Sequence, residues 1–176
     1  MLVTINTDAS YHKWFKYGGY AYWIVSNEFR FKGSGMLRKK IKRPEEAEAQ
    51  SILNALVVLF SSVVDNGIIS KVIINNDCQN AMAALMGDTK HLRKYKCYSQ
   101  MQSYRNKMRL VLEKYGQTKL EIEFRYVKAH SDVDDPRSFV NEFCDHNAKF
   151  QMYNRVNKSR ESDKVYNYKI PEKYKV

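Results

Sequence analysis

The first forty residues contain three stretches rich in β-branched, aromatic and other apolar side chains, which is the pattern of strands. Residues 2–7 are β-branched and alternating, and they predict a strand that ends at Asp8. After a polar and aromatic connection, Gly18-Gly19 precedes a second predicted strand at 20–25, and a short turn leads to a third at 29–37. Because the links are too short for crossovers, these strands should form an antiparallel meander.

The rest of the chain mixes helical and strand patterns. Pro44 followed by two acids predicts the start of a helix that runs to about residue 65. Residues 72–74 are wholly apolar and predict a short buried strand, and residues 120–126 alternate as a half-buried strand does. This order predicts an α/β fold whose mixed five-stranded sheet joins the meander to two parallel strands and is flanked by helices. Further helices are expected at 81–86, at about 99–114 and at 136–152.

Composition adds an expected partner to this picture. The 176 residues include 30 Lys and Arg against 19 Asp and Glu, a formal net charge of +11. Such a balance favours a polyanionic partner, nucleic acid before an anionic membrane surface. The length fits one domain with a tail, and we expect a catalytic domain at residues 1–152 and a basic, loosely held tail at residues 153–176.

Other features indicate the setting in which the protein works. The longest apolar run, residues 55–60, is far shorter than the roughly 20 residues that span a bilayer, and the first residues do not resemble a signal peptide. The three cysteines form no CxxC pair, so neither a disulfide framework nor a zinc site is expected. We therefore expect a soluble, cytoplasmic monomer with no membrane contact.

Four acidic residues occupy positions where acids are locally awkward. Asp8 ends a hydrophobic strand and Asp77 follows another, and α/β sheets place their sites at the carboxyl ends of strands. Glu48 shares a helical stripe with apolar residues, and Asp145 lies one turn after Asn141 in the last predicted helix. Each acid alone could be a cap, a dipole-stabilising acid or an exposed helix residue, so the argument rests on all four together.

Converging acids repel one another unless a cation neutralises them. Oxygen ligands suit Mg²⁺ or Mn²⁺. Two such ions, roughly 3.5–4 Å apart, can activate a water and stabilise the leaving oxygen in phosphoryl transfer. Together with the basic charge, the four acids predict a nuclease that uses metal ions.

Six short motifs, in this order, resemble those of the ribonuclease H family. The resemblance covers about residues 1–150 and implies a ribonuclease H-like fold. Each motif is weak alone, and their order on the predicted elements makes the resemblance specific. The motifs are Thr7-Asp8-Ala9-Ser10, Gly18-Gly19-Tyr20-Ala21, Glu48 followed by Ala55-Leu56, Asn76-Asp77-Cys78-Gln79, Tyr126-Val127-Lys128-Ala129-His130-Ser131 and Asn141-Glu142-Phe143-Cys144-Asp145.

The resemblance implies roles for particular residues. Asp8, Glu48, Asp77 and Asp145 would be the ligands of two Mg²⁺ or Mn²⁺ ions, with Asp8 bridging both. His130 would assist proton transfer or product release, a role that suits a side chain titrating near pH 7. The implied activity is endonucleolytic hydrolysis of the RNA strand of RNA–DNA hybrids.

The resemblance also implies contacts with the nucleic acid. Gln79 resembles a residue that contacts the minor groove, and Asn141 one that orients the site. Residues 90–109 stand where the family has a basic helical handle that grips the duplex. Contacts between its cations and phosphates would add affinity that weakens with salt and carries no sequence information. The best candidates for phosphate contacts are Lys90, Arg93, Lys94 and Lys96.

Two departures from the family pattern weaken the expectation of strict hybrid preference. Residues 11–17 replace a glycine-rich, asparagine-containing turn, and Pro44 and Glu45 stand where asparagines commonly precede the helix glutamate. The missing groups help to read the 2′-hydroxyls of the RNA strand. Trp14, with its neighbours Phe15 and Tyr17, could stack on bases or form a small apolar cluster.

Two alternatives therefore stay open beside hybrid cleavage. The same fold could serve another cut, namely junction resolution, strand transfer or exonuclease trimming. The chain could also be a nucleic-acid-binding module without catalysis, although the presence of all four acids argues against a loss of the chemistry.

Overall fold

The structure is a computed structural model that describes residues 1–63, 65–127, 136–162 and 164–176. Five strands and six α-helices make up the described part, together with two short 3₁₀ turns. In chain order the elements are β1 (Leu2–His12), β2 (Tyr17–Val25), β3 (Arg30–Met36), α1 (Pro44–Ser62), β4 (Lys71–Asn76), α2 (Gln79–Met86), α3 (Thr89–Lys94), α4 (Tyr98–Met101), α5 (Tyr104–Lys114), β5 (Glu121–Tyr126) and α6 (Pro136–Ser159), with the turns at Asn66–Ile68 and Glu172–Tyr174.

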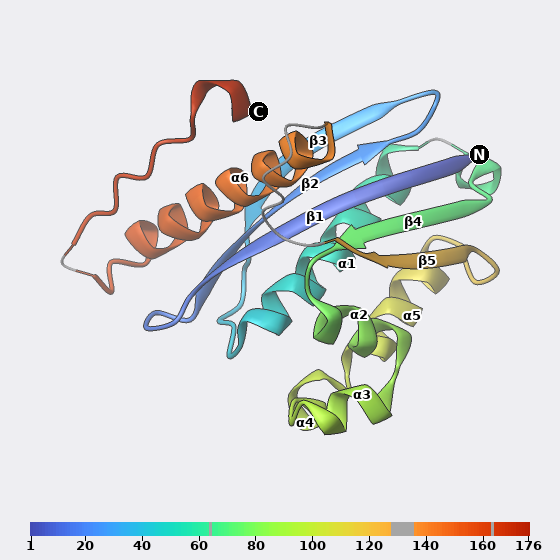
Figure 1. Ribbon diagram of the computed structural model, residues 1–176, viewed down its shortest axis with the longest axis horizontal. Helices are drawn as coiled ribbons and strands as arrows, with labels where there is room; N and C mark the ends of the chain where they lie inside the picture. Colours follow the sequence, from blue (N-terminus) through green and yellow to red (C-terminus); the bar gives the residue numbers. More distant parts are fainter. Residues whose placement is uncertain (64, 128–135, 163) are drawn as a thin grey trace.

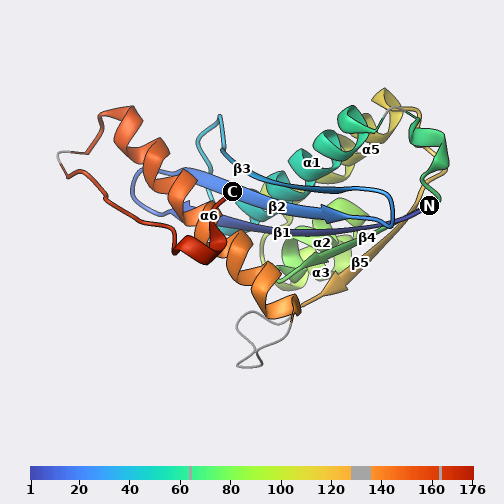
Figure 2. The ribbon, with the colours of Figure 1, turned by 90° about the horizontal axis from the view of Figure 1, so that it is seen from above.

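The strands form one sheet in the order β3-β2-β1-β4-β5 (Figure 1). The pairs β1–β2 and β2–β3 are antiparallel, and β1–β4 and β4–β5 are parallel. Figure 2 shows the sheet close to edge-on, with α1 and α5 on one side and the first half of α6 on the other. The predicted mixed five-stranded sheet is therefore confirmed.

The main core lies between the sheet and α1. Val3 and Ile5 alternate along β1 toward α1, whose Ile52, Leu56 and Leu59 repeat at helical spacing; all five side chains are fully buried. Burial of a side chain of this size contributes roughly 1.5–3 kcal/mol. This packing fixes α1 against β1 and so fixes the position of Glu48 relative to Asp8.

The opposite face of the sheet holds α6 at very close range. A Cβ added to Gly19 of β2 would lie 2.2 Å from the carbonyl oxygen of Ala148 and 2.4 Å from the backbone nitrogen of Met152. Only a residue without a side chain allows a helix backbone to approach a strand this closely. Gly19 thereby sets the distance between the sheet and the helix that carries Asp145.

Strand β1 is longer than the sequence predicts. It continues through Asp8 to His12, because its antiparallel ladder with β2 runs on from Asp8↔Ala21 to His12↔Tyr17. Its parallel ladder with β4 stops earlier, at Asn6↔Asn75. The predicted strand end at Asp8 is wrong, but Asp8 does lie just beyond the carboxyl end of the parallel β1–β4 pair.

The chain after residue 152 is more ordered than expected. Helix α6 continues to Ser159, and the following segment, red in Figure 1, runs back along it. Asn157 and Tyr166 exchange two hydrogen bonds of 3.0 Å, and the Asn147 side-chain amide donates to the Tyr174 carbonyl at 2.7 Å. Tyr174 is 2% exposed. The expectation of a loosely held tail is wrong here, because its tyrosines pack on α6; the division at residue 152 stays a prediction.

The edge strand β5 carries a charged side chain at every second position, and these side chains pair with one another and with Lys71 of β4. The Lys71 ammonium lies 2.7 Å from carboxylate oxygens of both Glu121 and Glu123, and Arg125 lies 2.5 Å from Glu123. These four residues form what we call the charged edge.

Two expectations about the chain's setting can be compared with the structure. Cys78, Cys97 and Cys144 are free thiols, as the sequence predicts. None of the described helices is long and apolar enough to cross a membrane.

Candidate active site

Three carboxylates from three separate elements converge at one end of the parallel strands. Asp8 lies on β1, Glu48 on the second turn of α1, and Asp77 directly after β4. One oxygen from each lies within 4.8 Å of the other two. Glu48 is buried, Asp8 is partly buried and Asp77 is exposed. A small ion that reaches the site from solvent can therefore meet all three.

Neutral hydrogen-bond donors hold two of these carboxylates in place. The side-chain amide of Asn76 donates to Glu48 Oε2 at 3.0 Å. It also donates to the backbone carbonyl oxygen and to the side-chain Oγ1 of Thr7, each at 3.2 Å. The backbone N–H of Ala9 donates to Asp8 Oδ1 at 2.9 Å and to Glu48 Oε1 at 3.1 Å. Because these donors carry no formal charge, they orient the carboxylates without neutralising them.

The electrostatics of the cluster call for a cation. Burial raises the pKa of Asp8 to about 7, and the nearby Asp77 and Asp145 carboxylates contribute to that rise. The pKa of Glu48 is raised well above its ordinary value, first by burial and then by Asp8. A divalent cation reverses both effects because it stabilises the charged form of each acid. The all-oxygen donor set suits Mg²⁺ or Mn²⁺.

The fourth predicted acid lines the same cavity from α6. This cavity of about 350 Å³ is lined by Asp8, Glu48 and Asp77 together with Asp145 and Asn141. Asp145 Oδ2 accepts a hydrogen bond of 2.6 Å from Lys149, one helical turn later. The structure thus brings all four predicted acids to one cavity, with three in a tight group and Asp145 held by a lysine.

A second pocket opens on the other side of Glu48 and Asp77. Its volume is about 490 Å³, and it reaches from the start of α1 to the region after α3. Glu45, on its rim, pairs with Arg43 through two contacts of 3.3 and 3.2 Å. The other residues that line it are Pro44, Cys78, Gln79, Asn80, Tyr95 and Tyr126.

Comparison with known proteins places this geometry in a family. The family model described as RNase H matches residues 2–153. The chain belongs to the RNase H family. No curated protein matches its sequence.

Several solved structures, two of them of RNase H proteins, share the fold at low sequence identity. The N-terminal RNase H domain of rv2228c from Mycobacterium tuberculosis has a TM-score of 0.55 at 14% identity, covering 90% of this chain and 98% of that chain. LC11-RNase H1, isolated from compost and solved in complex with an RNA/DNA hybrid, has a TM-score of 0.59 at 12% identity, covering 88% and 99%. The prototype foamy virus protease-reverse transcriptase has a TM-score of 0.58 at 14% identity, covering 86% of this chain and 21% of that chain.

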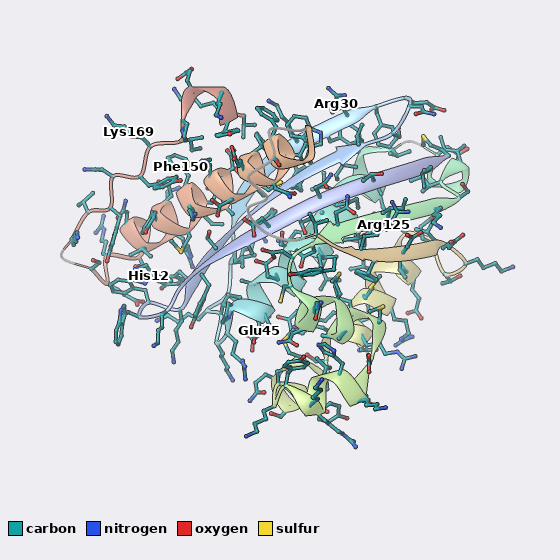
Figure 3. The ribbon with its side chains drawn as sticks, viewed as in Figure 1. His12, Arg30, Glu45, Arg125, Phe150 and Lys169 are labelled. Carbon is teal, nitrogen blue, oxygen red and sulfur yellow. The ribbon has the colours of Figure 1, made fainter. Side chains whose placement is uncertain are left out.

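The cations predicted for an RNase H handle are exposed and grouped. Lys90, Arg93 and Lys94 lie on α3 and Lys96 lies shortly after it. Arg43 donates a hydrogen bond of 3.5 Å to the Lys96 carbonyl, which links this group to the start of α1. In Figure 3 the side chains of the α3 and α4 region project away from the sheet, below Glu45. The predicted handle, residues 90–109, thus covers most of α3, all of α4 and the first part of α5, and its four candidate cations lie at its start, around Tyr95 of the second pocket.

The aromatic turn that departs from the RNase H pattern divides into two parts. Phe15 packs on His12 with ring centroids 4.8 Å apart, and Tyr17 is buried and donates to Glu161 at 2.8 Å. These two rings are thus engaged within the protein, Phe15 with His12 and Tyr17 with Glu161. Trp14 is 80% exposed and lines neither cavity. Its predicted contact with nucleic acid therefore lies beyond the two cavities, at the far end of β1.

His130 lies outside the described residues, so its predicted role stays a prediction. The sequence analysis assigned no role to several residues that line the two cavities: Thr7, Asn76 and Tyr126, which belong to the quoted motifs, and Tyr95 and Lys149, which do not. Two of them carry a signal that could have found them. Asn76 is a polar residue at the end of an apolar strand, and Lys149 follows Asp145 at the spacing of a helical ion pair.

Proposed function

We propose that this member of the RNase H family is an endonuclease that hydrolyses the RNA strand of RNA–DNA hybrids with two divalent metal ions. The observation that carries the proposal is the convergence of Asp8, Glu48 and Asp77 within 4.8 Å, with Asp145 on the same cavity. Raised acid pKa values at a cavity of this kind are typical of sites that work with a cation.

The four acids would hold Mg²⁺ or Mn²⁺. When bound, the ions supply an activated water and stabilise the leaving oxygen of the phosphodiester. The chain's own contribution is orientation: the Asn76 amide and the Ala9 N–H fix the directions of the Glu48 and Asp8 oxygens. Such supporting hydrogen bonds commonly change metal affinity or activity by about 10–100-fold.

The substrate class is supported by charge and by a neighbouring structure. The chain carries a net charge of +11, and its α3 region presents four exposed cations. LC11-RNase H1, which shares the fold, was solved in complex with an RNA/DNA hybrid. In the proposal, the α3 cations contact phosphates, Gln79 and Asn141 contact the nucleic acid near the acids, and His130 assists proton transfer. Trp14 would contact a more distant part of the duplex.

The test compares cleavage of a labelled RNA–DNA hybrid, duplex DNA, duplex RNA and a four-way junction, each with Mg²⁺ or Mn²⁺. Cleavage of the RNA strand of the hybrid alone, abolished by EDTA, is the expected result. Asp77→Asn should lower the rate at least about 100-fold, because it removes a ligand charge worth several kcal/mol in the transition state.

The matched control is Asp65→Asn, which changes an exposed acid outside both cavities and should leave the rate unchanged. Full activity in Asp77→Asn would refute the carboxylate assignment. Cleavage of the junction in preference to the hybrid would instead establish the alternative cut.

A further inference from the structure

Only two of the chain's 13 tyrosines are exposed, and both line the same pocket. Tyr95 is 48% exposed and Tyr126 is 54% exposed, whereas the other eleven are buried or partly buried. Both belong to the second pocket, which also contains Glu48 and Asp77. Aromatic rings left in solvent beside a candidate active site indicate a surface that is covered when a ligand binds.

Tyr95 is held in position by its neighbours. Its ring centroid lies 4.6 Å from that of His91, and a His91 ring nitrogen lies 2.9 Å from the side-chain oxygen of Asn80. Asn80 itself lines the pocket. The ring therefore needs little reorganisation to accept a partner, which favours binding because the cost in side-chain entropy is smaller.

Tyr126 is placed by the sheet. It pairs with Asn76 as the last register position between β4 and β5, and the next backbone N–H, that of Val127, donates to the Asn76 carbonyl at 3.1 Å. Since Asp77 follows Asn76 directly, the strand pairing brings the Tyr126 ring beside the carboxylate cluster. The two tyrosines thus come from separate elements to one pocket.

The lining of the pocket selects an uncharged planar ring. It contains the carboxylates Glu45, Glu48 and Asp77, and none of the described residues that line it is a lysine or an arginine. These carboxylates favour an uncharged group over a phosphate, except where a bound cation or the Arg43 that pairs with Glu45 offsets their charge. The Asn80 side chain is engaged with His91, whereas the amide of Gln79 offers a donor and an acceptor of the kind that pair with base edges. Tyrosine rings stack on bases.

We propose that this pocket is a nucleobase subsite, in which Tyr95 and Tyr126 stack on a base of the bound nucleic acid, next to the Gln79 that the proposed function already assigns to the nucleic acid. The proposal rests on the proposed function and deepens it by naming how the substrate is held beside the acids. Lys94, whose ammonium lies 5.2 Å from the Tyr95 ring centroid, is placed to meet a phosphate of the same strand.

The first experiment measures binding without cleavage. A short fluorescein-labelled RNA–DNA hybrid is titrated in EDTA, and its affinity is read by fluorescence anisotropy. Tyr95→Ala and Tyr126→Ala should each bind roughly 5- to 150-fold more weakly, the range that corresponds to stacking on one base. Tyr95→Phe keeps the ring and should bind within about twofold of the wild type.

The matched control is Leu110→Ala, which removes an equally exposed apolar side chain, 51% exposed, from α5 outside this pocket. Circular dichroism checks that each variant is folded. An equal drop in affinity in Leu110→Ala, or an unchanged affinity in both tyrosine variants, overturns the proposal.

The second experiment locates the base. Abasic nucleotides are placed one at a time along each strand of the hybrid. At one position the missing base should weaken binding to the wild type but not further weaken binding to Tyr95→Ala or Tyr126→Ala. If the effects of the abasic nucleotide and of the tyrosine substitution on affinity are additive at every position, the subsite is overturned, even if the wild type cleaves the hybrid. If the effects of the missing base and of the tyrosine substitution are non-additive at one position, but the protein cleaves none of the substrates, the subsite is supported and the proposed function is refuted.

Discussion

Asp8 is the residue at which the demands of folding and of catalysis oppose each other most clearly. Its carboxylate is partly buried next to Glu48, its pKa is raised to about 7 by burial, and the N–H group that donates to it is uncharged. A group that is costly to keep charged and is nevertheless placed at a cavity is best explained by a cation that binds there.

Substitution of Asp8 should separate stability from activity. Asp8→Asn keeps an oxygen that can accept the Ala9 N–H and removes the buried charge, so the metal-free variant should be more stable by about 2–4 kcal/mol at pH 8. This corresponds to a rise in Tm of several degrees. Cleavage should fall at least about 100-fold. Thermal unfolding in EDTA and the hybrid assay measure the two effects, and a less stable Asp8→Asn would contradict this account.

The pH dependence follows from the same shift. Because the pKa of Asp8 is above its unfolded value of 3.8, the native state holds a proton that the unfolded state releases between about pH 4 and 7. The metal-free protein should therefore become more stable as the pH falls across this range, and the trend should be weaker in Asp8→Asn.

Magnesium should show the opposite pH trend. The ion binds the deprotonated acids, so the rise in Tm that Mg²⁺ produces should be large at pH 8 and small at pH 6. Differential scanning fluorimetry with and without Mg²⁺ measures it. An equal rise in Tm with Mg²⁺ at pH 8 and at pH 6 would show that the ion binds outside the carboxylate cluster.

At the scale of the elements, the site depends on how closely α6 approaches the sheet. Gly19 allows the backbone of α6 to lie against β2, and α6 brings Asp145 and Asn141 to the cavity. The position of the fourth acid therefore depends on a glycine in a strand that carries none of the acids.

Gly19→Ala should destabilise the protein by at least about 3 kcal/mol. The new Cβ would lie 2.2 Å from the Ala148 carbonyl oxygen, and backbone cannot move aside as a flexible side chain can. Urea unfolding measures the change. Gly67→Ala is the control, since Gly67 lies in an exposed turn where the added Cβ meets only an Asp65 side-chain oxygen at 3.0 Å. Equal stability of the two variants would mean that α6 can shift away from the sheet.

The sequence predicted these elements unevenly, for physical reasons. The five-stranded sheet and the acids on β1, α1 and β4 were predictable, because periodicity and motif order are local signals. The end of β1 was not, since it depends on β2 pairing beyond the point where β4 departs. Similarly, the composition of the segment after Ser159 predicts a basic tail, whereas the structure shows that Tyr174 of this segment is buried on α6. The exposed rings of Tyr95 and Tyr126 depend on tertiary packing, which no local pattern contains.

At the scale of the whole molecule, the four acids gather at one cavity, where Lys149 pairs with Asp145, while the α3 cations lie outside that cavity. The net charge of +11 draws a polyanion to the surface, and the α3 cations lie next to the pocket beside the acids. Affinity should therefore fall steeply with salt.

Replacing Lys90, Arg93 and Lys94 by alanine should lower the slope of log affinity against log salt by about 0.9 for each phosphate that the protein no longer neutralises. The drop in affinity should be similar for every hybrid sequence, since phosphates carry no sequence information. Anisotropy titrations in EDTA at several salt concentrations measure both. The control replaces Lys114 and Lys119, exposed cations near the opposite end of β5, and an equal change of slope there would show that the α3 group has no special role.

The charged edge has a consequence for how copies of this protein behave when crowded. A strand at the border of a sheet offers free backbone groups to any other strand, and such borders are where soluble proteins begin to aggregate. On β5, Glu121, Glu123 and Arg125 place a charged side chain at every second position along that border, and the two glutamates pair with Lys71 of the neighbouring strand. A second copy that added its own strand there would have to bury those charges. This agrees with the monomer expected from the sequence, which stays a prediction, and it marks β5 as a poor place to introduce apolar substitutions when the protein is concentrated or engineered.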